Sequence, residues 1–507
     1  MTVWAKLPPR SKLGLEIAAA AVVGGIVGDQ LLRAMPWGLN VALGTTALIG
    51  TGIWLMRRHN VKPGPDAAWL AITALLLGLA FLRRDAQPLD GFDALALIGA
   101  LAMAAASVQG EVIAKWYPID WARGVVSAAA ASVAGGFQLL FSDISWRELP
   151  HDDRLRNVRR VALGLLLATP VLLIFAGLFS SADPVFGNVL SNLFAFNAET
   201  VISHMFFIGF WAFLVAGYFR WSFLGRPLHG VTPTLKPIQS IVPLATALAL
   251  IDLLFLLFVV VQLRYFFGGA VLVEQTSGLT YAEYARRGFF ELMTASILVL
   301  PILLGAEALV HAGTASQLRV FRQLAGLLLA LLAVVMISAF QRMRLYVEAF
   351  GLSAQRLYAT AFMTLLFGML AWFAWTVLRG RRDRFVFGSL MQALAVLAGL
   401  HVMNPDAFIV NTNLNRPHAE RPFDAKYAVT LGGDAVPPLL SALPRLNAED
   451  RCIVVRGLLR RWDQAEVDWR TWNWSRARAR SLVRGQADAL KAELASCPAP
   501  KDSRNDH

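Results

Sequence analysis

Long apolar runs follow one another along the chain, with short polar stretches between them. An α-helix rises about 1.5 Å per residue, so about 20 apolar residues cross the hydrocarbon core of a bilayer. In lipid, every backbone N–H and C=O must be bonded internally, so each run is predicted to be a helix. Twelve runs lie within residues 13–34, 37–56, 67–82, 92–112, 121–142, 158–180, 200–223, 241–267, 288–311, 323–346, 355–378 and 385–403. The pattern predicts an all-α, polytopic membrane bundle of about 11–12 transmembrane helices.

The composition favours the same class. Of the 507 residues, 56% are hydrophobic and 16% are charged, whereas soluble domains carry about 25% charged residues. The net charge of +13 comes largely from basic residues at the ends of apolar runs, as in residues 56–62 and 379–384. That placement is typical of loops anchored at a membrane surface. We therefore expect the lipid bilayer, and not nucleic acid, as a partner.

Basic residues also indicate how the chain threads the membrane. The loops at 147–160, 220–236, 319–322 and 379–384 carry 14 Lys and Arg residues, and the loops between them carry 6. The positive-inside rule places the richer set in the cytoplasm and residues 404–507 outside it. The N-terminal third is also basic and should therefore begin in the cytoplasm. Twelve full spans, however, would put the N-terminus on the same side of the membrane as the tail, outside the cytoplasm. Either the 16-residue run 67–82 does not cross fully, or the N-terminus lies outside.

We expect three parts along the chain: N-terminal transmembrane segments (1–157), a transmembrane core (158–403) and a helical extramembrane tail (404–507). The two cysteines, Cys452 and Cys497, both lie in the tail. A disulfide between them would close a long loop outside the cytoplasm, and two unrelated free thiols are the alternative. Residues 470–494 read as one basic amphipathic helix led by tryptophans. It either lies on an anionic membrane surface or packs its tryptophans into a helical cap.

Six motifs carry a resemblance to a known family. In order, they are SADPVF (181–186), DLLFLLFVVVQLRYFFGG (252–269), GLTYAEYARRGFFEL (278–292), SAFQRMRLYVEAFGLSAQRLYA (338–359), NPDAFIVNTNLNR (404–416) and DAVPPLL (434–440). Together they resemble bacterial polytopic membrane proteins catalogued as domain of unknown function 4173, with its neighbour 4153. The resemblance spans roughly residues 158–445. It implies a location in the bacterial cytoplasmic (inner) membrane, and it carries no catalytic residue over to this chain.

One group of polar residues is predicted to line a path through the bilayer: Asp252, Gln262, Glu283, Arg287 and Glu291. Asp252 has eleven residues of its run before it and fifteen after, and a carboxylate at mid-bilayer costs about 3 kcal/mol. It should therefore face protein or water. It is either a protonatable group in the path or a neutral, hydrogen-bonded group that fixes helix packing.

The helix that carries the rest of this path is predicted to start just before it enters the membrane. Thr280, with Glu283 three residues later, forms a capping-box pattern. The polar stretch is then either an interfacial first turn or the lining of a polar entrance. The glycine-bearing junction at 266–269 is predicted to break the preceding helix, since irregular backbone at depth usually lines cavities.

A second group is predicted at the outer face of the membrane. Its members are Arg342, Arg344, Asp406, Asn411, Asn413, Asn415 and Arg416. Amide and guanidinium groups suit sugars or phosphates, but capping of loops and helices is the favoured interpretation, because asparagine strongly prefers caps and turns. Two single polar positions, Asp29 and His204, have weaker evidence and read either as packing residues or as functional ones.

The chain carries no recognisable catalytic signature. Walker, G-x-G-x-x-G, H-E-x-x-H and G-x-S-x-G motifs and Cys/His metal spacings are absent from the sequence, so we expect no cofactor and no metal. The favoured function is non-enzymatic transport or sensing of a small polar or ionic solute, an anion among the choices. An envelope enzyme acting on a lipid-linked or glycan substrate, or a structural partner subunit, is the alternative. Protein partners are not identified.

Overall fold

The structure, a computed structural model, describes residues 8–144, 198–225, 240–277, 289–311, 313–416, 422–464 and 468–498, with positions 164, 168, 172, 175–183 and 186. Throughout these residues the chain is helical or irregular and forms no strand, which confirms the all-α class. Ten of the described helices are long and apolar enough to cross a membrane. The protein is therefore a multi-pass membrane protein.

The ten spans coincide with ten of the twelve apolar runs. They are α1 (Pro9–Leu32), α2 (Leu39–Arg58), α4 (Gln87–Val108), α5 (Pro118–Gln138) with its π-helical end η3 (Leu139–Asp143), α8 (Ala198–Leu224), α9 (Val242–Ser277), α11 (Phe289–Val310), α12 (Ala315–Phe350), α13 (Ala354–Thr376) and α14 (Phe385–Met403). The third run forms α3 (Ala67–Ala80), whose 14 residues reach only about 21 Å. The sixth run, 158–180, lies largely outside the described residues.

The chain divides into two compact units built from alternating segments. Unit 1 comprises Met1–Met35, Gly44–Pro63 and Val126–Pro227, and unit 2 comprises Pro36–Leu43, Gly64–Val125 and Leu228–His507. The three-part division expected along the chain stays a prediction.

In unit 1, α1 and α8 approach closely along a stripe of small residues. A Cβ atom added at Gly24 would lie 3.0 Å from Val215 Cγ1, and one added at Gly28 would lie 2.6 Å from Trp211 Cγ. Lipid tails are as apolar as leucine, so helices in a bilayer associate through close packing rather than through the hydrophobic effect. The glycines of α1 allow that packing.

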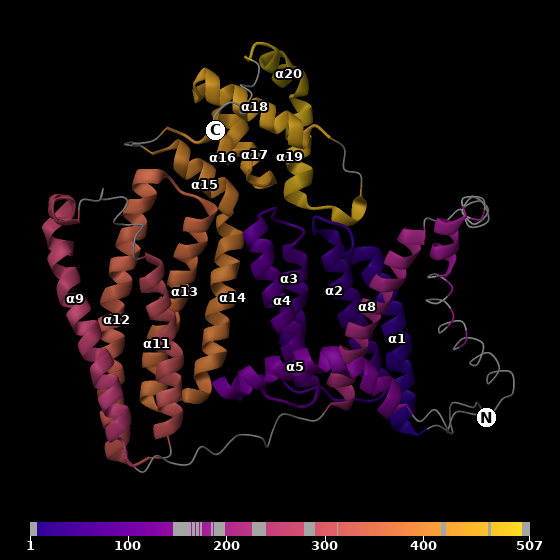
Figure 1. Ribbon diagram of the computed structural model, residues 1–507, viewed down its shortest axis with the longest axis horizontal. Coiled ribbons are helices and arrows are strands. Elements are labelled where there is room, and N and C mark those ends of the chain that lie inside the picture. The colour runs from indigo at the N-terminus through magenta and orange to yellow at the C-terminus, as the bar shows by residue number, and fades with distance from the viewer. Residues whose placement is uncertain are drawn as a thin grey trace. The chain divides into compact units, whose positions relative to one another are not determined.

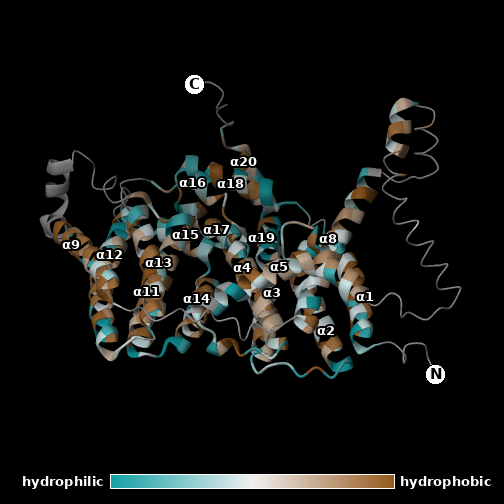
Figure 2. Ribbon diagram, turned by 60° about the horizontal axis from the view of Figure 1, so that its bottom comes forward, coloured by the Kyte–Doolittle hydropathy of each residue, from teal (hydrophilic) through white to brown (hydrophobic). Residues whose placement is uncertain are grey.

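In unit 2, α9, α11, α12, α13 and α14 share one apolar core. Its most deeply buried members are Leu303 of α11, Leu328 and Leu332 of α12, and Phe373 of α13. Figure 1 shows these five helices side by side, from pink to orange. In Figure 2 the ribbons of α9, α11 and α13 are largely hydrophobic, whereas α16 and α19 carry many hydrophilic residues.

The predicted break at residues 266–269 is wrong. Helix α9 continues through both glycines of this stretch and ends at Ser277. A glycine inside a helix costs only about 1 kcal/mol relative to alanine, so two of them do not stop a helix on their own.

The C-terminal tail, defined here as residues 404–498, is a compact helical region with its own core. Its elements are α15 (Pro405–Leu414), α16 (Ala425–Ala428), η7 (Gly433–Ala435), α17 (Val436–Ala442), η8 (Leu443–Arg445), α18 (Ala448–Trp462), η9 (Trp469–Thr471), α19 (Trp474–Gly485) and α20 (Ala487–Ala495). Val454, Val455 and Leu458 of α18 pack with Ala479 and Val483 of α19, all nearly inaccessible to solvent. Burying a valine or leucine side chain from water contributes about 1.5–3 kcal/mol.

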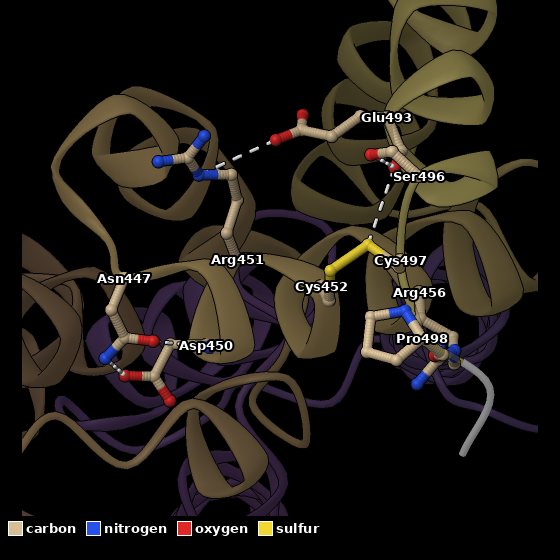
Figure 3. Close-up of a disulfide and its surroundings, with 9 residues drawn as sticks. All are labelled: Asn447, Asp450, Arg451, Cys452, Arg456, Glu493, Ser496, Cys497 and Pro498. Carbon is tan, nitrogen blue, oxygen red and sulfur yellow. Dashed lines mark hydrogen bonds and ion pairs between the residues drawn. A yellow bond between two sulfur atoms is a disulfide. The ribbon is translucent and has the colours of Figure 1, made fainter.

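A disulfide closes the tail. Cys452 in α18 is bonded to Cys497 after α20, 45 residues later, with the Cα atoms 5.7 Å apart (Figure 3). Next to it, Arg456 Nη2 donates a hydrogen bond of 2.9 Å to the carbonyl of Pro498. The bond thus ties the end of the tail to its central helix.

The segment 470–494 is not one helix. It forms η9, α19 and α20, and the break between the last two falls at Gln486. The expected packing of the tryptophans into the cap is also wrong, because the Trp469 and Trp474 side chains are 62% and 59% exposed. The backbone of this segment makes the contacts instead: Trp474 N–H donates to the carbonyl of Leu82.

Candidate functional site

The tail joins the transmembrane helices of unit 2 through a sharp turn at Asn404. This residue ends α14 and precedes α15 with a φ of +59°, in the left-handed region that asparagine tolerates better than most residues. Pro405 then takes the first position of α15, where a missing N–H is harmless. The turn brings Asp406 back towards the end of α14.

The loop between α3 and α4, residues 81–86, contacts the tail. The side-chain amide of Asn473 donates hydrogen bonds of 2.7 Å to the carbonyls of Phe81 and Arg84. Asn473 is fully buried and also caps α19 by accepting from Arg476 N–H. One asparagine therefore satisfies two loop carbonyls and one helix end.

Arg476 of α19 is the most connected cation of the joint. Its guanidinium lies 2.7 Å from Asp85 Oδ1 and donates to the carbonyls of Trp37 at 2.8 Å and Thr471 at 2.5 Å. The residue as a whole is only 4% exposed. A buried cation needs acceptors of this kind, because leaving it unpaired would be strongly unfavourable. Its Nε atom is buried without a partner in the described chain.

Two glycines let the tail backbone reach the carboxylates. Gly432 N–H donates to Asp406 Oδ2 at 2.7 Å, and Gly433 N–H donates to Asp85 Oδ2 at 2.9 Å. A Cβ atom at Gly432 would overlap the carbonyl oxygen of Asp85 and lie 2.8 Å from Asp406 Oδ2. Any side chain at this position would therefore push the tail away from the loop.

Arg84 links the loop to both α14 and the tail. Its guanidinium donates to the carbonyl of His401 at 2.9 and 2.7 Å and lies 3.1 Å from Asp434 Oδ1. The same carboxylate oxygen accepts from the Asn404 side-chain amide at 3.2 Å. On the membrane side, His401 Nε2 lies 3.0 Å from both oxygens of Asp93, which is 1% exposed.

We call this set of residues the acidic joint. Its members are Asp85, Asp90, Asp93, Asp406, Asp434, Arg84, Arg476 and His401. Asp90 belongs to it because it interacts electrostatically with Asp85, Asp93 and Asp406. Five carboxyl groups thus meet two arginines in a largely buried volume, with Arg461 near Asp406, so the carboxyl groups outnumber the arginines.

Two oxygen atoms of the joint have no hydrogen-bond partner in the described part of the chain. Asp434 Oδ2 and Asn404 Oδ1 are both buried, and both are acceptors. A buried polar atom without a partner costs about 1–3 kcal/mol, so a donor beside this pair, whether a water molecule, a proton or a cation, would be stabilising. A proton on the carboxyl group or a cation would supply what these acceptors lack.

The electrostatics of the joint act directly on Asp406. The pKa of this carboxyl group is raised to about 7: burial is the largest cause, the charges of Asp85 and Asp434 add to it, and the Gly432 hydrogen bond and Arg461 oppose the rise. Asp406 is 4% exposed. Its charge therefore changes near neutral pH.

A metal ion is not the obvious occupant. Among the residues that the structure describes, no three His, Cys, Asp or Glu side chains come close enough to hold one. The unpartnered acceptors are also one carboxylate and one amide, which suit a proton or an ammonium group as well as they suit a metal.

The predicted polar path is only partly described. Asp252 lies inside α9 with 3% exposure, and neither of its carboxylate oxygens has a hydrogen-bond partner within the described segments. Gln262 Oε1, ten residues later, accepts a hydrogen bond of 2.5 Å from Ser338 of α12. Glu291 is exposed in the first turn of α11, and Glu283 and Arg287 lie outside the described residues.

The predicted outer-face group is divided in the described structure between contacts to a backbone turn and the acidic joint. The amide of Asn413 bonds both backbone groups of Leu352, and Arg416 donates to the carbonyl of Glu348. These contacts cap the turn between α12 and α13. Arg344 is exposed and pairs with Glu348 at 2.8 Å.

The remaining members of this group contribute less to that turn. Arg342 is partly buried on α12, whereas Asn411 and Asn415 are exposed at α15. Asp406 belongs to the acidic joint instead. In the described structure, Asn413 and Arg416 of the outer-face group therefore cap a backbone turn, and the buried charged residues lie in the acidic joint.

Unit 1 contains buried carboxylates of a different kind. Asp29 lies 2.6 Å from His204 Nδ1, and Asp143 binds both Arg10 and Arg220 at 2.6 and 2.5 Å. In these clusters cations match or outnumber the acids. They connect α1 and η3 to α8, so they read as helix-packing contacts rather than as a site with capacity for a further cation.

Sequence reasoning did not identify most of the acidic joint. Of its members, only Asp406 was singled out, and it was assigned to the outer-face group. A usable signal was present: Asp85, Asp90 and Asp93 lie within nine residues at the start of one apolar run, and His401 lies at the end of another. Ionisable groups that bunch at run ends next to a short, incomplete span favour a shared polar site.

Comparison with known families gives one match. A family model described as domain of unknown function (DUF4153) matches residues 71–442, nearly three quarters of the chain. This is the neighbour of the family that the motifs resemble, and the match starts earlier than the motifs do; family 4173 itself stays a prediction. No curated protein and no solved structure matches the chain.

Proposed function

The chain belongs to the family of the domain of unknown function DUF4153, and we propose that it is a non-enzymatic membrane protein that transports or senses a small cation at the acidic joint. The sequence leaves the charge of the solute open. The excess of carboxylates over arginines in the joint favours a cation and disfavours an anion.

One observation carries this proposal. Asp434 Oδ2 and Asn404 Oδ1 are buried acceptors without partners, in a cluster where five aspartates face two arginines. Acceptors in such an arrangement gain most from a positively charged donor, because charge-assisted hydrogen bonds are about twice as strong as neutral ones. Asp252, a buried carboxylate in α9, is a second position where a proton or cation would be stabilised.

The membrane location and orientation of the chain are proposed from its basic loops and its disulfide. We propose that the chain lies in a bacterial cytoplasmic membrane with the tail outside the cytoplasm. The basic loops favour this orientation. The Cys452–Cys497 disulfide supports it, because disulfides persist in oxidising compartments and are rare in the cytosol.

The first experiment measures cation binding to the full chain in an uncharged maltoside detergent. Thermal unfolding midpoints are compared in sodium, potassium, magnesium and tetramethylammonium chloride at equal ionic strength. A cation at about 100 times its dissociation constant adds about 2.7 kcal/mol to the stability of the state it binds. We expect one of these cations to raise the midpoint clearly more than the others.

Variants then locate the effect. Asp434→Asn keeps the shape and removes one negative charge, so it should lose the cation-specific rise. Asp488→Asn is the matched control, because Asp488 is exposed on α20 outside the joint. An equal rise in all four salts, or one that survives in Asp434→Asn, would overturn the proposal.

A second experiment separates transport from sensing. The chain is reconstituted into liposomes that contain a pH-sensitive dye, and flux of the binding cation or of protons is followed after a concentration jump. Flux above that of protein-free liposomes assigns transport. Binding without flux assigns sensing.

A further inference from the structure

A deep apolar groove lies in unit 2 between α3, α4, α13 and α14. Its volume is about 340 Å³, within the range of about 300–1,000 Å³ that is usual for small-molecule sites. Leu70, Met103 and Leu400 form its buried floor. Leu95, 69% exposed, and Phe92, 44% exposed, line its open side. The groove can therefore be entered from the surface of the helices.

The lining holds few polar groups, and two of them, the Trp121 indole N–H and the Tyr358 hydroxyl, are buried without a partner in the described chain. Tyr358 of α13 is 8% exposed, and its hydroxyl is buried without a hydrogen-bond partner in the described chain. Its ring lies 5.7 Å from the ring of Phe92, centroid to centroid. A tyrosine hydroxyl is almost always bonded when buried, so this one indicates a missing donor or acceptor in the groove.

The tyrosine marks the end of the groove that meets the acidic joint. Its hydroxyl interacts electrostatically with the carboxyl groups of Asp406, Asp90 and Asp93. The acidic joint begins one helical turn beyond the lining, because Asp93 precedes the lining residue Ala96 by three positions in α4 and His401 follows the lining residue Leu397 by four in α14. The lining itself is apolar, and the acids lie just beyond its Tyr358 end.

We propose that the groove and the acidic joint together bind an amphiphilic ammonium compound, with its hydrocarbon part in the groove and its positive group beside Tyr358, Asp90 and Asp93. This inference rests on the proposed function and narrows it, since the cation becomes the head of a longer molecule, held at the side of the joint that Asp90 and Asp93 form.

Three features select this chemistry. Apolar walls exclude a fully hydrated inorganic ion from the groove, and they favour a hydrocarbon chain. The carboxylates of the joint attract a cation and repel the phosphate or carboxylate head of an anionic lipid. The neighbouring, tilted rings of Phe92 and Tyr358 suit an ammonium group, because aromatic faces attract cations and recognise quaternary ammonium ligands in particular.

The test uses a single thiol placed in the groove. The native cysteines are joined in the disulfide, so Ala361→Cys, on the groove lining, introduces one free thiol. Its alkylation by N-ethylmaleimide is timed in the full chain in an uncharged maltoside detergent. Four probes are compared: decyltrimethylammonium, decyl sulfate, decanol and tetramethylammonium.

We expect decyltrimethylammonium alone to protect the thiol. At about ten times its dissociation constant, a bound ligand leaves about one tenth of the sites free and slows alkylation about tenfold. Equal protection by decanol or decyl sulfate would mean that the groove accepts any chain, including ordinary bilayer lipid, and would overturn the inference. So would the absence of protection by decyltrimethylammonium.

A groove-filling variant provides an independent check. Gly99 lines the groove, and a Cβ atom there would meet only Met103 Cε, at 4.0 Å, so Gly99→Leu should fill the space without disturbing the helices. Decyltrimethylammonium should raise the unfolding midpoint of the native chain and of Gly305→Leu, a control at an open position on α11, but not that of Gly99→Leu. A rise in Gly99→Leu equal to that in the control contradicts the inference.

The outcomes separate the two proposals. If tetramethylammonium raises the midpoint in an Asp434-dependent way and the decyl chain adds nothing, the small-cation proposal stands and the amphiphile inference is wrong. If no cation has an Asp434-dependent effect and decyltrimethylammonium gives no protection, both are wrong.

Discussion

Arg476 and Asp85, 391 residues apart in the chain, form an ion pair of 2.7 Å that joins the tail to the loop between α3 and α4. Their side chains are 5% and 13% exposed. The pair therefore contributes far more to the position of the tail than a surface salt bridge would, because removing one partner leaves the other charge buried and uncompensated.

Replacing Arg476 should weaken the attachment of the tail. Arg476→Met leaves Asp85 unpaired and two carbonyls without a donor, a change expected to cost about 3–5 kcal/mol. We expect a lower unfolding midpoint and faster tryptic release of the tail. Arg478→Met is the control, since Arg478 is exposed on the same helix, and equal effects of the two variants would contradict a specific role for Arg476.

The raised pKa of Asp406 predicts a pH dependence of stability. Its pKa of about 7 in the folded chain exceeds the value of 3.8 for an unperturbed carboxyl group, so the folded state binds the proton more tightly. Stability should therefore fall as the pH rises from about 4 to about 7, and the penalty should be fully present above pH 7. The shift corresponds to as much as about 4 kcal/mol.

Asp406→Asn tests this dependence. The variant cannot ionise but can still accept the Gly432 hydrogen bond, so it should be more stable than the native chain at pH 8.5 and similar to it at pH 4. Thermal unfolding across this range measures the effect. A native chain and a variant with parallel pH profiles would show that Asp406 does not titrate near neutrality.

Asp252 should affect function more than folding. The carboxyl group is buried in α9 without a partner, and a charged group at this depth costs about 2.5–3.5 kcal/mol. Asp252→Asn should therefore fold at least as well as the native chain and lose proton or cation flux in liposomes. Normal flux in a well-folded Asp252→Asn protein would remove Asp252 from the path and leave it a packing residue.

The disulfide makes the position of the tail measurable. In intact cells, a membrane-impermeant thiol reagent should label Cys452 and Cys497 only after mild reduction. Labelling that requires permeabilised cells would place the tail in the cytoplasm. In the purified chain, reduction should destabilise the tail by about 4 kcal/mol, the chain-entropy value for a loop closed over 45 residues.

Gly432 provides a backbone test of the joint. In Gly432→Ala the new Cβ atom would overlap the Asp85 carbonyl oxygen, so the tail must move or the loop must deform. We expect a large fall in the unfolding midpoint and loss of cation binding. Gly485→Ala, at the open end of α19, is the control and should be neutral or slightly stabilising.

The membrane helices could be predicted from the sequence because their signal is local. A run of about 20 apolar residues determines its own helix, and the 16-residue run 67–82 forms a helix of only 14 residues. The break predicted at the glycines of α9 was wrong for a related reason. The prediction considered the glycines alone and not the apolar helical residues on both sides of them.

The acidic joint could not be predicted in the same way, because its residues meet only through tertiary contacts. Asp85, Asp434 and Arg476 come from three distant segments, and each alone reads as a surface charge near a helix end. Asp252 shows the opposite case. Its burial follows from its position in the run, whereas its lack of a partner depends on which side chains α12 presents.

The close approach at Gly432 has a mechanical consequence. Here the backbone of the tail rests directly on the backbone of the α3–α4 loop, and the Gly432 N–H is held by the carboxylate of Asp406. Because no flexible side chain lies between the two segments, a displacement of one backbone must displace the other. A change of charge at Asp406 that loosens this contact would therefore move the main chain of α3 and α4. Since both helices line the groove, movement of the tail would change the shape of the groove.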